Sequence, residues 1–169
     1  MHHLPTYIMA ICYISFGSNK GDRSKNVARA LDSFRKHFTI LDISSFYDTE
    51  PVYKTQNGNF LNAVIKVETD FTPVEVCEKV KLIETQLGKI NVDRTEDKII
   101  DIEFLYYGDK IVKNSPVIVP HHKAHTRKHI LAAMAEISPE HVHPALGKTQ
   151  KELLKELKCK KEVTAIPHA

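Results

Sequence analysis

Two carboxylates, Asp101 and Glu103, stand two positions apart inside an apolar run that covers residues 99–107. Successive side chains of a β-strand point to opposite faces, so both carboxylates are expected on the same side, with their Cα atoms about 6.5 Å apart. The opposite, core-facing side is expected to carry the apolar residues Ile100, Ile102, Phe104 and Tyr106.

Such a carboxylate pair is suited to hold a divalent cation. Two neighbouring anions raise each other's pKa unless a cation lies between them. Mg²⁺ binds proteins through one or two carboxylates and completes its shell with substrate phosphates. The pair therefore indicates a Mg²⁺ site for a phosphorylated substrate, while a solvated acidic strand face is the alternative that the pair alone leaves open.

Cations cluster on both sides of this strand. The polar segment 89–98 precedes it and carries Lys89, Arg94 and Lys98. These side chains could screen a polyphosphate and close over it, although an ordinary solvated loop would look the same. Beyond the strand and an extended connector, three more side chains can donate hydrogen bonds to phosphate: His121, Lys123 and Arg127.

Histidines and cysteines give no comparable signal. His125 and His129 are one helical turn apart, but no carboxylate or cysteine has a matching spacing, so we expect no dedicated transition-metal site. His141 and His143 are expected at the surface. The three cysteines are scattered without a CxxC spacing, which is typical of reduced thiols in a cytoplasmic protein.

The composition is that of a globular protein. The chain has 169 residues, of which 42% are hydrophobic and 27% charged, and we expect one domain over 1–169 with its core at about 8–157. The net charge of +3 suits a small anionic substrate and is too weak to argue for nucleic acid. The apolar segment 8–16 is too short to span a bilayer and lacks a basic flank, so we expect a buried strand, and overall a monomer without membrane contact.

Hydrophobic periodicity predicts the elements that position these residues. Alternation favours strands over 8–16, 41–47, 60–68 and 99–107. One helix is predicted from an apolar stripe between Val27 and Phe38, and another from the capping box of Thr72 and Glu75, with Gly88 at its end. Residues 50–59 are expected to form a mobile loop.

The C-terminal part is expected to begin with a short strand that ends near Val112 and an extended connector over 116–120. Helices over 127–137 and 152–157 follow, and the tail from Lys158 is expected to be loose. The order β-α-β-β-α-β predicts a ferredoxin-like α+β fold, with an antiparallel sheet, both helices on one face and a C-terminal hairpin strand and helices added. The other face is left for ligands or for the C-terminal helices.

Asn62 is expected on that other face, together with the carboxylates. Leu61, Ala63, Ile65 and Val67 share the helix-facing side of its strand. An Asn offers donors and an acceptor that can bind the amide edge of a heterocycle, while a hydrogen bond to a neighbouring loop is the simpler alternative.

The sequence resembles the 6-hydroxymethyl-7,8-dihydropterin pyrophosphokinase family. The matching segments follow one another over about residues 8–157, and they are 15–23, 44–52, 60–64, 83–88, 101–103, 119–121, Arg127 and 135–140. The resemblance implies a ferredoxin-like fold and transfer of pyrophosphate from ATP to the pterin hydroxymethyl group, with release of AMP, in folate biosynthesis.

The resemblance also implies roles for individual residues. Two Mg²⁺ ions would be held by Asp101 and Glu103, and these two residues with Lys89 and Lys98 would carry catalysis. The pterin would be bound by Thr49, Val52, Phe60, Asn62, Asp101 and His129. ATP would be bound by Glu84, Lys89, Lys98, His121 and Arg127, to which the cation Arg94 of the loop is added.

Several of these positions depart from the family pattern. Glu103 replaces an Asp, which shifts a ligand oxygen in a site that requires octahedral geometry. Lys89 and Lys98 replace Arg and lose bidentate phosphate binding, and His129 stacks more weakly than Phe. We therefore expect a slower enzyme with altered metal preference or, alternatively, a catalytically weakened paralogue that binds pterin or nucleotide. An RNA-recognition domain shares the element order but needs paired aromatics, which residues 60–67 do not supply.

Overall fold

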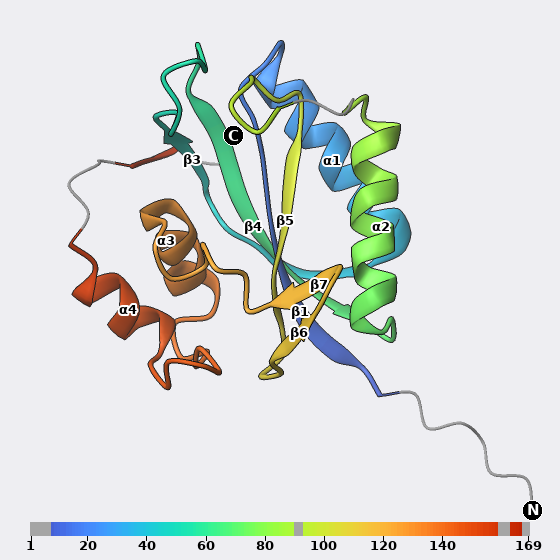
Figure 1. Ribbon diagram of the computed structural model, residues 1–169, viewed down its shortest axis with the longest axis vertical. Coiled ribbons are helices and arrows are strands. Elements are labelled where there is room, and N and C mark those ends of the chain that lie inside the picture. The colour runs from blue at the N-terminus through green and yellow to red at the C-terminus, as the bar shows by residue number, and fades with distance from the viewer. Residues whose placement is uncertain (1–7, 90–92, 159–162, 167–169) are drawn as a thin grey trace, which may run out of the picture.

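A computed structural model describes residues 8–89, 93–158 and 163–166 (Figure 1). The strands are β1 Ala10–Ser18, β2 Thr39–Ile43, β3 Phe46–Thr49, β4 Phe60–Thr69, β5 Asp101–Tyr107, β6 Val112–Asn114, β7 Val117–Val119 and β8 Thr164–Ile166. The helices are α1 Arg23–His37, α2 Pro73–Gln86, α3 Lys128–Ile137 and α4 Gln150–Glu156.

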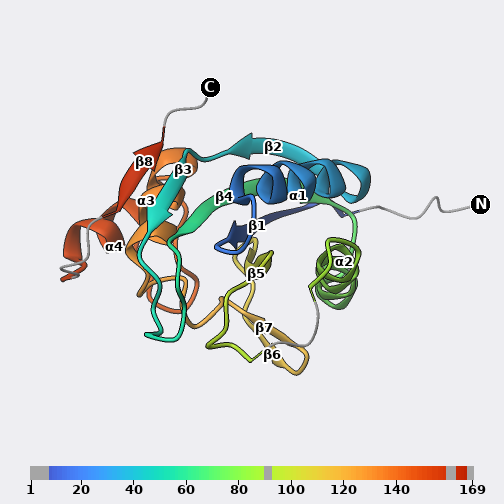
Figure 2. The ribbon, with the colours of Figure 1, turned by 90° about the horizontal axis from the view of Figure 1, so that it is seen from above.

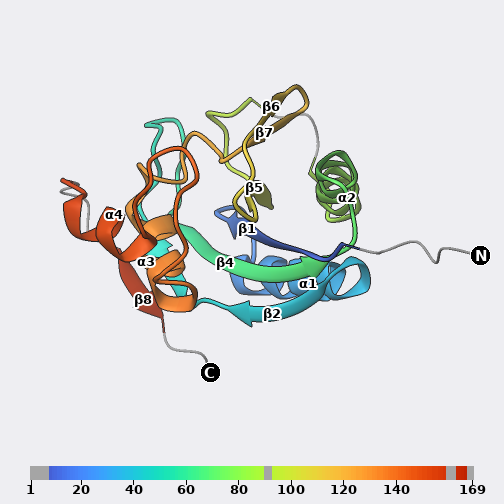
Figure 3. The same ribbon diagram turned by 90° about the horizontal axis from the view of Figure 1, so that it is seen from below.

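The main sheet is antiparallel and confirms the predicted ferredoxin-like topology. Its strands lie in the order β5-β1-β4-β3-β8, and β2 also pairs with β4. Helices α1 and α2 lie to one side of the molecule, and α3, α4 and β8 gather on the other (Figures 2 and 3). The strands that carry the two carboxylates and Asn62 therefore have helices α1 and α2 on one face and α3 on the other.

Two apolar clusters hold these layers together. Under α1 and α2, the predicted inward residues of β4 pack with fully buried Phe16 and Phe34. Under α3, Val64 of β4 packs with Ile130 and Met134. The predicted start of α2 is confirmed, because Thr72 and Glu75 form a complete capping box. Because side chains alternate along β4, one face of the strand packs in the cluster under α1 and α2 and the other face in the cluster under α3.

The prediction for Tyr106 was wrong. Tyr106 lies opposite Tyr13 of β1, whereas the next pair joins Phe104 to Ile14, so Leu105 is an extra residue on β5. This irregularity has the form of a β-bulge, which interrupts the alternation of side chains. Tyr106 is consequently buried under α3, while the preceding apolar residues face α1 and α2 as expected: Ile100, Ile102 and Phe104.

The strand predicted over 41–47 is two strands, β2 and β3, separated at Ser44. The Ser44 N–H donates to the Val64 carbonyl, and its hydroxyl accepts a hydrogen bond from the Val64 N–H. The next residue, Ser45, donates from both its N–H and its hydroxyl to Glu136 of α3. A side chain thus replaces part of the strand ladder at this break.

Three C-terminal expectations were also wrong, namely the end of a strand near Val112, the loose tail, and the surface position of His141 and His143. Val112 begins a strand rather than ending one, and the connector contains β7, which forms a hairpin with β6. The tail is not loose throughout, because β8 pairs with β3. His143 is buried and His141 is half-buried, and their rings pack against Tyr106. Within the described ranges, no helix is both long and apolar enough to cross a membrane.

Candidate active site

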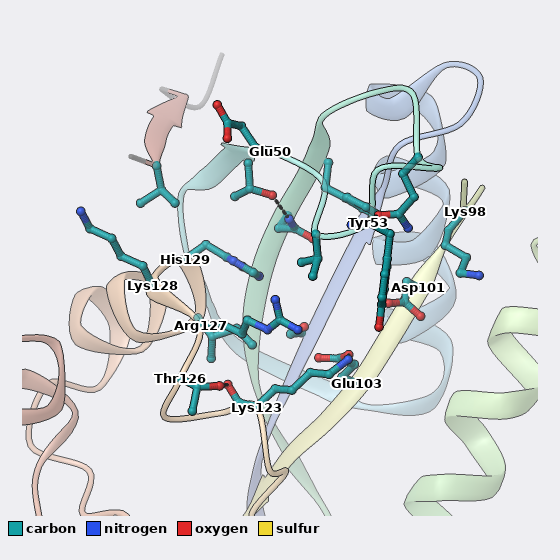
Figure 4. A pocket seen from close by; sticks show the side chains of 18 of the residues that line it. Glu50, Tyr53, Lys98, Asp101, Glu103, Lys123, Thr126, Arg127, Lys128 and His129 are labelled. Carbon is teal, nitrogen blue, oxygen red and sulfur yellow. Dashed lines mark hydrogen bonds and ion pairs between the residues drawn. The ribbon is translucent and has the colours of Figure 1, made fainter. Parts of the chain in front are cut away.

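A cavity of about 490 Å³ opens at the end of the sheet, between the start of α3 and the loops that follow β3 and precede β5 (Figure 4). Its lining brings together predicted residues from distant parts of the sequence: Thr49, Val52, Phe60, Asn62, Lys89, Arg94, Lys98, Asp101, Glu103, Arg127 and His129. Two predicted residues, Glu84 and His121, do not line it.

The two carboxylates of β5 face this cavity, and each has a lysine beside it. The Lys89 ammonium donates to Asp101 Oδ1 at 3.1 Å, and Lys123 Nζ lies 3.6 Å from Glu103 Oε1. Figure 4 shows Lys123 reaching across from the far wall to Glu103. Burial and the neighbouring Asp101 raise the pKa of Glu103, while Lys123 and Arg127 oppose this shift. The two carboxylates therefore lie on the cavity wall, each with a lysine as its counter-ion.

Glu84 positions Lys89 from behind the cavity wall. Its carboxylate accepts hydrogen bonds from the Lys89 ammonium and from the Ile102 N–H, the latter at 3.2 Å. Burial raises the pKa of Glu84, against the effect of Lys89. Burial alone would lower the pKa of Lys89, but the charges of Asp101 and Glu84 outweigh it, so that the pKa is raised. Lys89 is thus a firmly charged ammonium at the end of α2.

Lys98 is held by the turn that follows β1. Its N–H donates to Asn19 Oδ1 at 2.6 Å, and its carbonyl accepts from the Asn19 N–H at 2.9 Å. Asn19 also donates to Asp97 and to the Gly58 carbonyl. The turn therefore fastens the loop before β5 to the loop after β3.

These two loops also contact each other directly. The Gln56 amide donates to the Glu96 carbonyl at 3.0 Å, and the Asn57 N–H donates to Asp97 Oδ1 at 2.9 Å. The loop expected to be mobile thus has defined hydrogen-bond partners. Residues 90–92 of the other loop lie outside the described residues.

Asn62 and its neighbours form another part of the cavity. Asn62 donates to the Thr49 hydroxyl at 2.7 Å, and Thr49 is paired with Phe60 across the β3–β4 ladder. Gly17 of β1 lies directly beside Asn62, since a Cβ at position 17 would fall 1.9 Å from Asn62 Oδ1. Only glycine leaves room for this amide, a requirement that the sequence pattern alone did not reveal.

Two histidines, His129 at the start of α3 and His121 in the segment before it, are neutral at physiological pH. Burial, assisted by Arg127, lowers the pKa of His129 to about 4. Burial likewise lowers the pKa of His121 to about 4. The His121 ring stacks on His122, and its Nδ1 accepts from the Lys123 N–H, so it shapes the turn that carries Lys123 and Arg127.

Sequence reasoning did not assign a site role to several residues that line the cavity. Lys123 was predicted to bind phosphate from its charge alone. Its contact with Glu103 could not be predicted from the positions of the two residues in the sequence. The others come from β1, from α3 and from loops, and they follow no chemical pattern in the sequence: Ser15, Glu50, Tyr53, Gln56, Thr126, Lys128, Ile130 and Val163. Across the part of the chain that the structure describes, no group of three or more His, Cys, Asp and Glu could hold a metal.

The family model for 7,8-dihydro-6-hydroxymethylpterin-pyrophosphokinase (HPPK) matches residues 13–139. The chain belongs to the HPPK family. Among relatives, it is 32% identical to the 2-amino-4-hydroxy-6-hydroxymethyldihydropteridine pyrophosphokinase of Aquifex aeolicus, over 85% of this chain and 90% of that protein. It is also 32% identical to the folic acid synthesis protein FOL1 of Dictyostelium discoideum, over 80% of this chain and 21% of that protein.

The chain thus spans about a fifth of the longer folate-synthesis proteins that it matches. Solved structures agree on the HPPK fold. The wild-type HPPK-DHPS of Plasmodium falciparum superposes with a TM-score of 0.69 at 16% identity, covering 88% of this chain and 45% of that one. Its complex with pteroate gives a TM-score of 0.71 at 15% identity, covering 88% and 44%.

Proposed function

We propose that this chain transfers the terminal pyrophosphoryl group of ATP to the hydroxymethyl group of 6-hydroxymethyl-7,8-dihydropterin, with AMP as the second product. One observation carries the proposal. A single cavity joins the carboxylate pair of Asp101 and Glu103 and six lysine and arginine side chains to the Asn62 amide and the rings of Phe60 and His129. The first set suits a nucleotide polyphosphate, and the second suits a heterocycle with hydrogen-bonding edges.

The pterin is assigned to the part of the cavity around Asn62. The Asn62 amide, held by Thr49, presents a carbonyl and an N–H to the amide edge of the ring. The rings of Phe60 and His129 supply flat apolar contact, and the low pKa of His129 keeps its ring uncharged. Val52 and the backbone near Thr49 complete this end.

The triphosphate is assigned to the cationic part. Lys89, Lys123 and Arg127 already lie beside the carboxylates, and Arg94 and Lys98 extend the positive lining along the loop. Ammonium and guanidinium groups favour charge that spreads over phosphate oxygens during transfer. On ATP binding, the lysines would exchange carboxylate contacts for phosphate contacts.

The donor set at β5 fits Mg²⁺. Asp101 and Glu103 offer hard oxygen ligands, and with only two carboxylates the rest of an octahedral shell falls to phosphate oxygens and water. We propose that these residues hold two Mg²⁺ ions together with ATP. When bound, the ions supply charge neutralisation along the triphosphate.

In the transfer, the hydroxymethyl oxygen attacks the β-phosphorus, and the bond between that phosphorus and the α-phosphate oxygen breaks. AMP leaves with the bonding electron pair, and the alcohol loses its proton. Asp101 and Asn62 both pair with Gly17, one on each side of β1, so Asp101 could orient the attacking oxygen of a pterin bound at Asn62. The hydrogen-bonded loops over the cavity limit access of water, which would otherwise hydrolyse ATP.

The test is AMP formation from ATP, Mg²⁺ and hydroxymethyldihydropterin, measured by chromatography with a control lacking pterin. Stoichiometric AMP and pterin diphosphate are expected only in the complete mixture. If calorimetry shows pterin binding but no AMP forms, the chain is a binding paralogue and the proposal fails. The relatives compared above are named as pyrophosphokinases or folate-synthesis proteins, which gives no support to that alternative.

A further inference from the structure

The C-terminal strand β8 lies at the edge of the sheet, next to the cavity. It pairs antiparallel with β3, joining Thr164 to Asp48 and Ala165 to Tyr47. All three residues of β8 are exposed. In Figure 4, β8 is the pale red arrow above His129 and close to Glu50. A segment that is more than 100 positions from β3 in sequence thus borders the candidate active site.

The residue just before β8, Val163, is the one that reaches the site. Continuing the ladder by one position places it beside Thr49, which is itself paired with Phe60. All three residues line the cavity. Val163 is half-buried and packs against the apolar cluster under α3.

The two faces of β8 have different surroundings. Strand alternation directs Val163 and Ala165 towards α3 and the cavity, and Thr164 and Ile166 to the opposite face. Ile166 is 36% exposed. Val163 therefore joins β8 to the cavity wall, whereas Ile166 is an aliphatic residue of the same segment on the other face.

We propose that Val163 is a specificity-determining residue for the pterin, and that it closes the side of the ring pocket left open by Phe60 and His129. This inference rests on the proposed function. A flat heterocycle is bound well only where apolar side chains exclude water from the parts that make no hydrogen bonds. Val163 adjoins β8, which lies at the opposite edge of the sheet from β5 and from the lysines beside its carboxylates, Lys89 and Lys123. Its contribution therefore concerns the pterin and leaves ATP unaffected.

The proposal also couples β8 to the ligand. Since β8 is exposed throughout, its docking depends on the β3 ladder and on Val163. A ring in contact with Val163 would stabilise the docked strand, and the docked strand would by reciprocity raise pterin affinity. Amide hydrogen exchange of residues 164–166 should therefore slow when pterin is added.

The experiment compares Val163→Ala with Ile166→Ala in the full chain, each shortening one aliphatic side chain of the same segment. The dissociation constant of the pterin is followed by its fluorescence, and KM is measured for both substrates. For Val163→Ala we expect pterin binding to weaken about fivefold to tenfold, because two carbon atoms of a half-buried side chain are lost, while KM for ATP stays within twofold of wild type. For Ile166→Ala, the dissociation constant of the pterin and KM for ATP should both stay within twofold of wild type.

Three results would overturn the proposal: unchanged pterin affinity in Val163→Ala, an equal loss in Ile166→Ala, or an equal rise of KM for ATP. Circular dichroism and the melting temperature check that both variants fold. If Val163→Ala does not fold, Val163→Thr, which keeps the shape of the side chain, is used in its place. Wild-type protein that makes no AMP and binds no pterin refutes the proposed function itself. If the wild type is active and Val163→Ala binds pterin as tightly as the wild type does, only the role of Val163 is refuted.

Discussion

Replacing His129 by Phe should make the protein more resistant to acid. The half-buried His129 ring lies at the start of α3, where loss of solvent and the charge of Arg127 lower its pKa from 6.5 to about 4. Below pH 6.5 the unfolded chain takes up a proton at this position, whereas the folded protein does not until about pH 4. The neutral ring therefore supports the fold above pH 6.5, and this support is lost between pH 6.5 and 4.

The size of the effect follows from these two pKa values. Each proton that only the unfolded chain binds lowers the free energy of unfolding by about 1.36 kcal/mol per pH unit. Protonation at His129 should therefore lower the free energy of unfolding by about 2 kcal/mol between pH 7 and pH 5. The full loss, reached below pH 4, is about 3 kcal/mol. Phe keeps a flat ring in the same position and removes the titration.

Urea denaturation at pH 7 and pH 5 would measure this difference. We expect the wild type to lose about 2 kcal/mol more than His129→Phe over this interval, beyond the contributions of His121 and other groups that both proteins share. Between pH 7 and pH 5, the melting temperature of the wild type should fall by about 4–8 °C more than that of His129→Phe. Equal losses in the two proteins would show that His129 is not held neutral by burial, and the assignment of an uncharged ring to the pterin site would fall with it.

Three further predictions concern the carboxylates and the contact between β3 and α3. Asp101→Ala should abolish AMP formation with little change in melting temperature, because Lys89 retains Glu84 as a partner; a large thermal loss would mark Asp101 as structural. Glu103→Asp should raise activity with Mg²⁺ relative to Mn²⁺, and an unchanged ratio would contradict the geometric argument. Glu136→Ala should lower the free energy of unfolding by about 2 kcal/mol, because it removes the acceptor of the Tyr47 hydroxyl at 2.8 Å, whereas Glu136→Gln should recover part of the loss in urea titrations.

Much of this fold and site was predictable from local pattern. The alternation of β4 and the capping box of Thr72 depend only on neighbours within a few positions, because side-chain direction and backbone hydrogen bonding are local properties. The shared face of Asp101 and Glu103 follows from the same rule, since these residues precede the bulge at Leu105. The family resemblance then named half of the residues that line the cavity.

Other features depend on contacts between distant segments, and only the tertiary structure decided them. The bulge that turns Tyr106 under α3 is set by pairing with β1, and the space for Asn62 is set by Gly17 on the neighbouring strand. β8 has three exposed residues and no apolar alternation, so its place beside β3 leaves no mark in the local sequence. Local periodicity determined which face of a strand a residue occupies, whereas packing between strands far apart in the chain determined what that face meets.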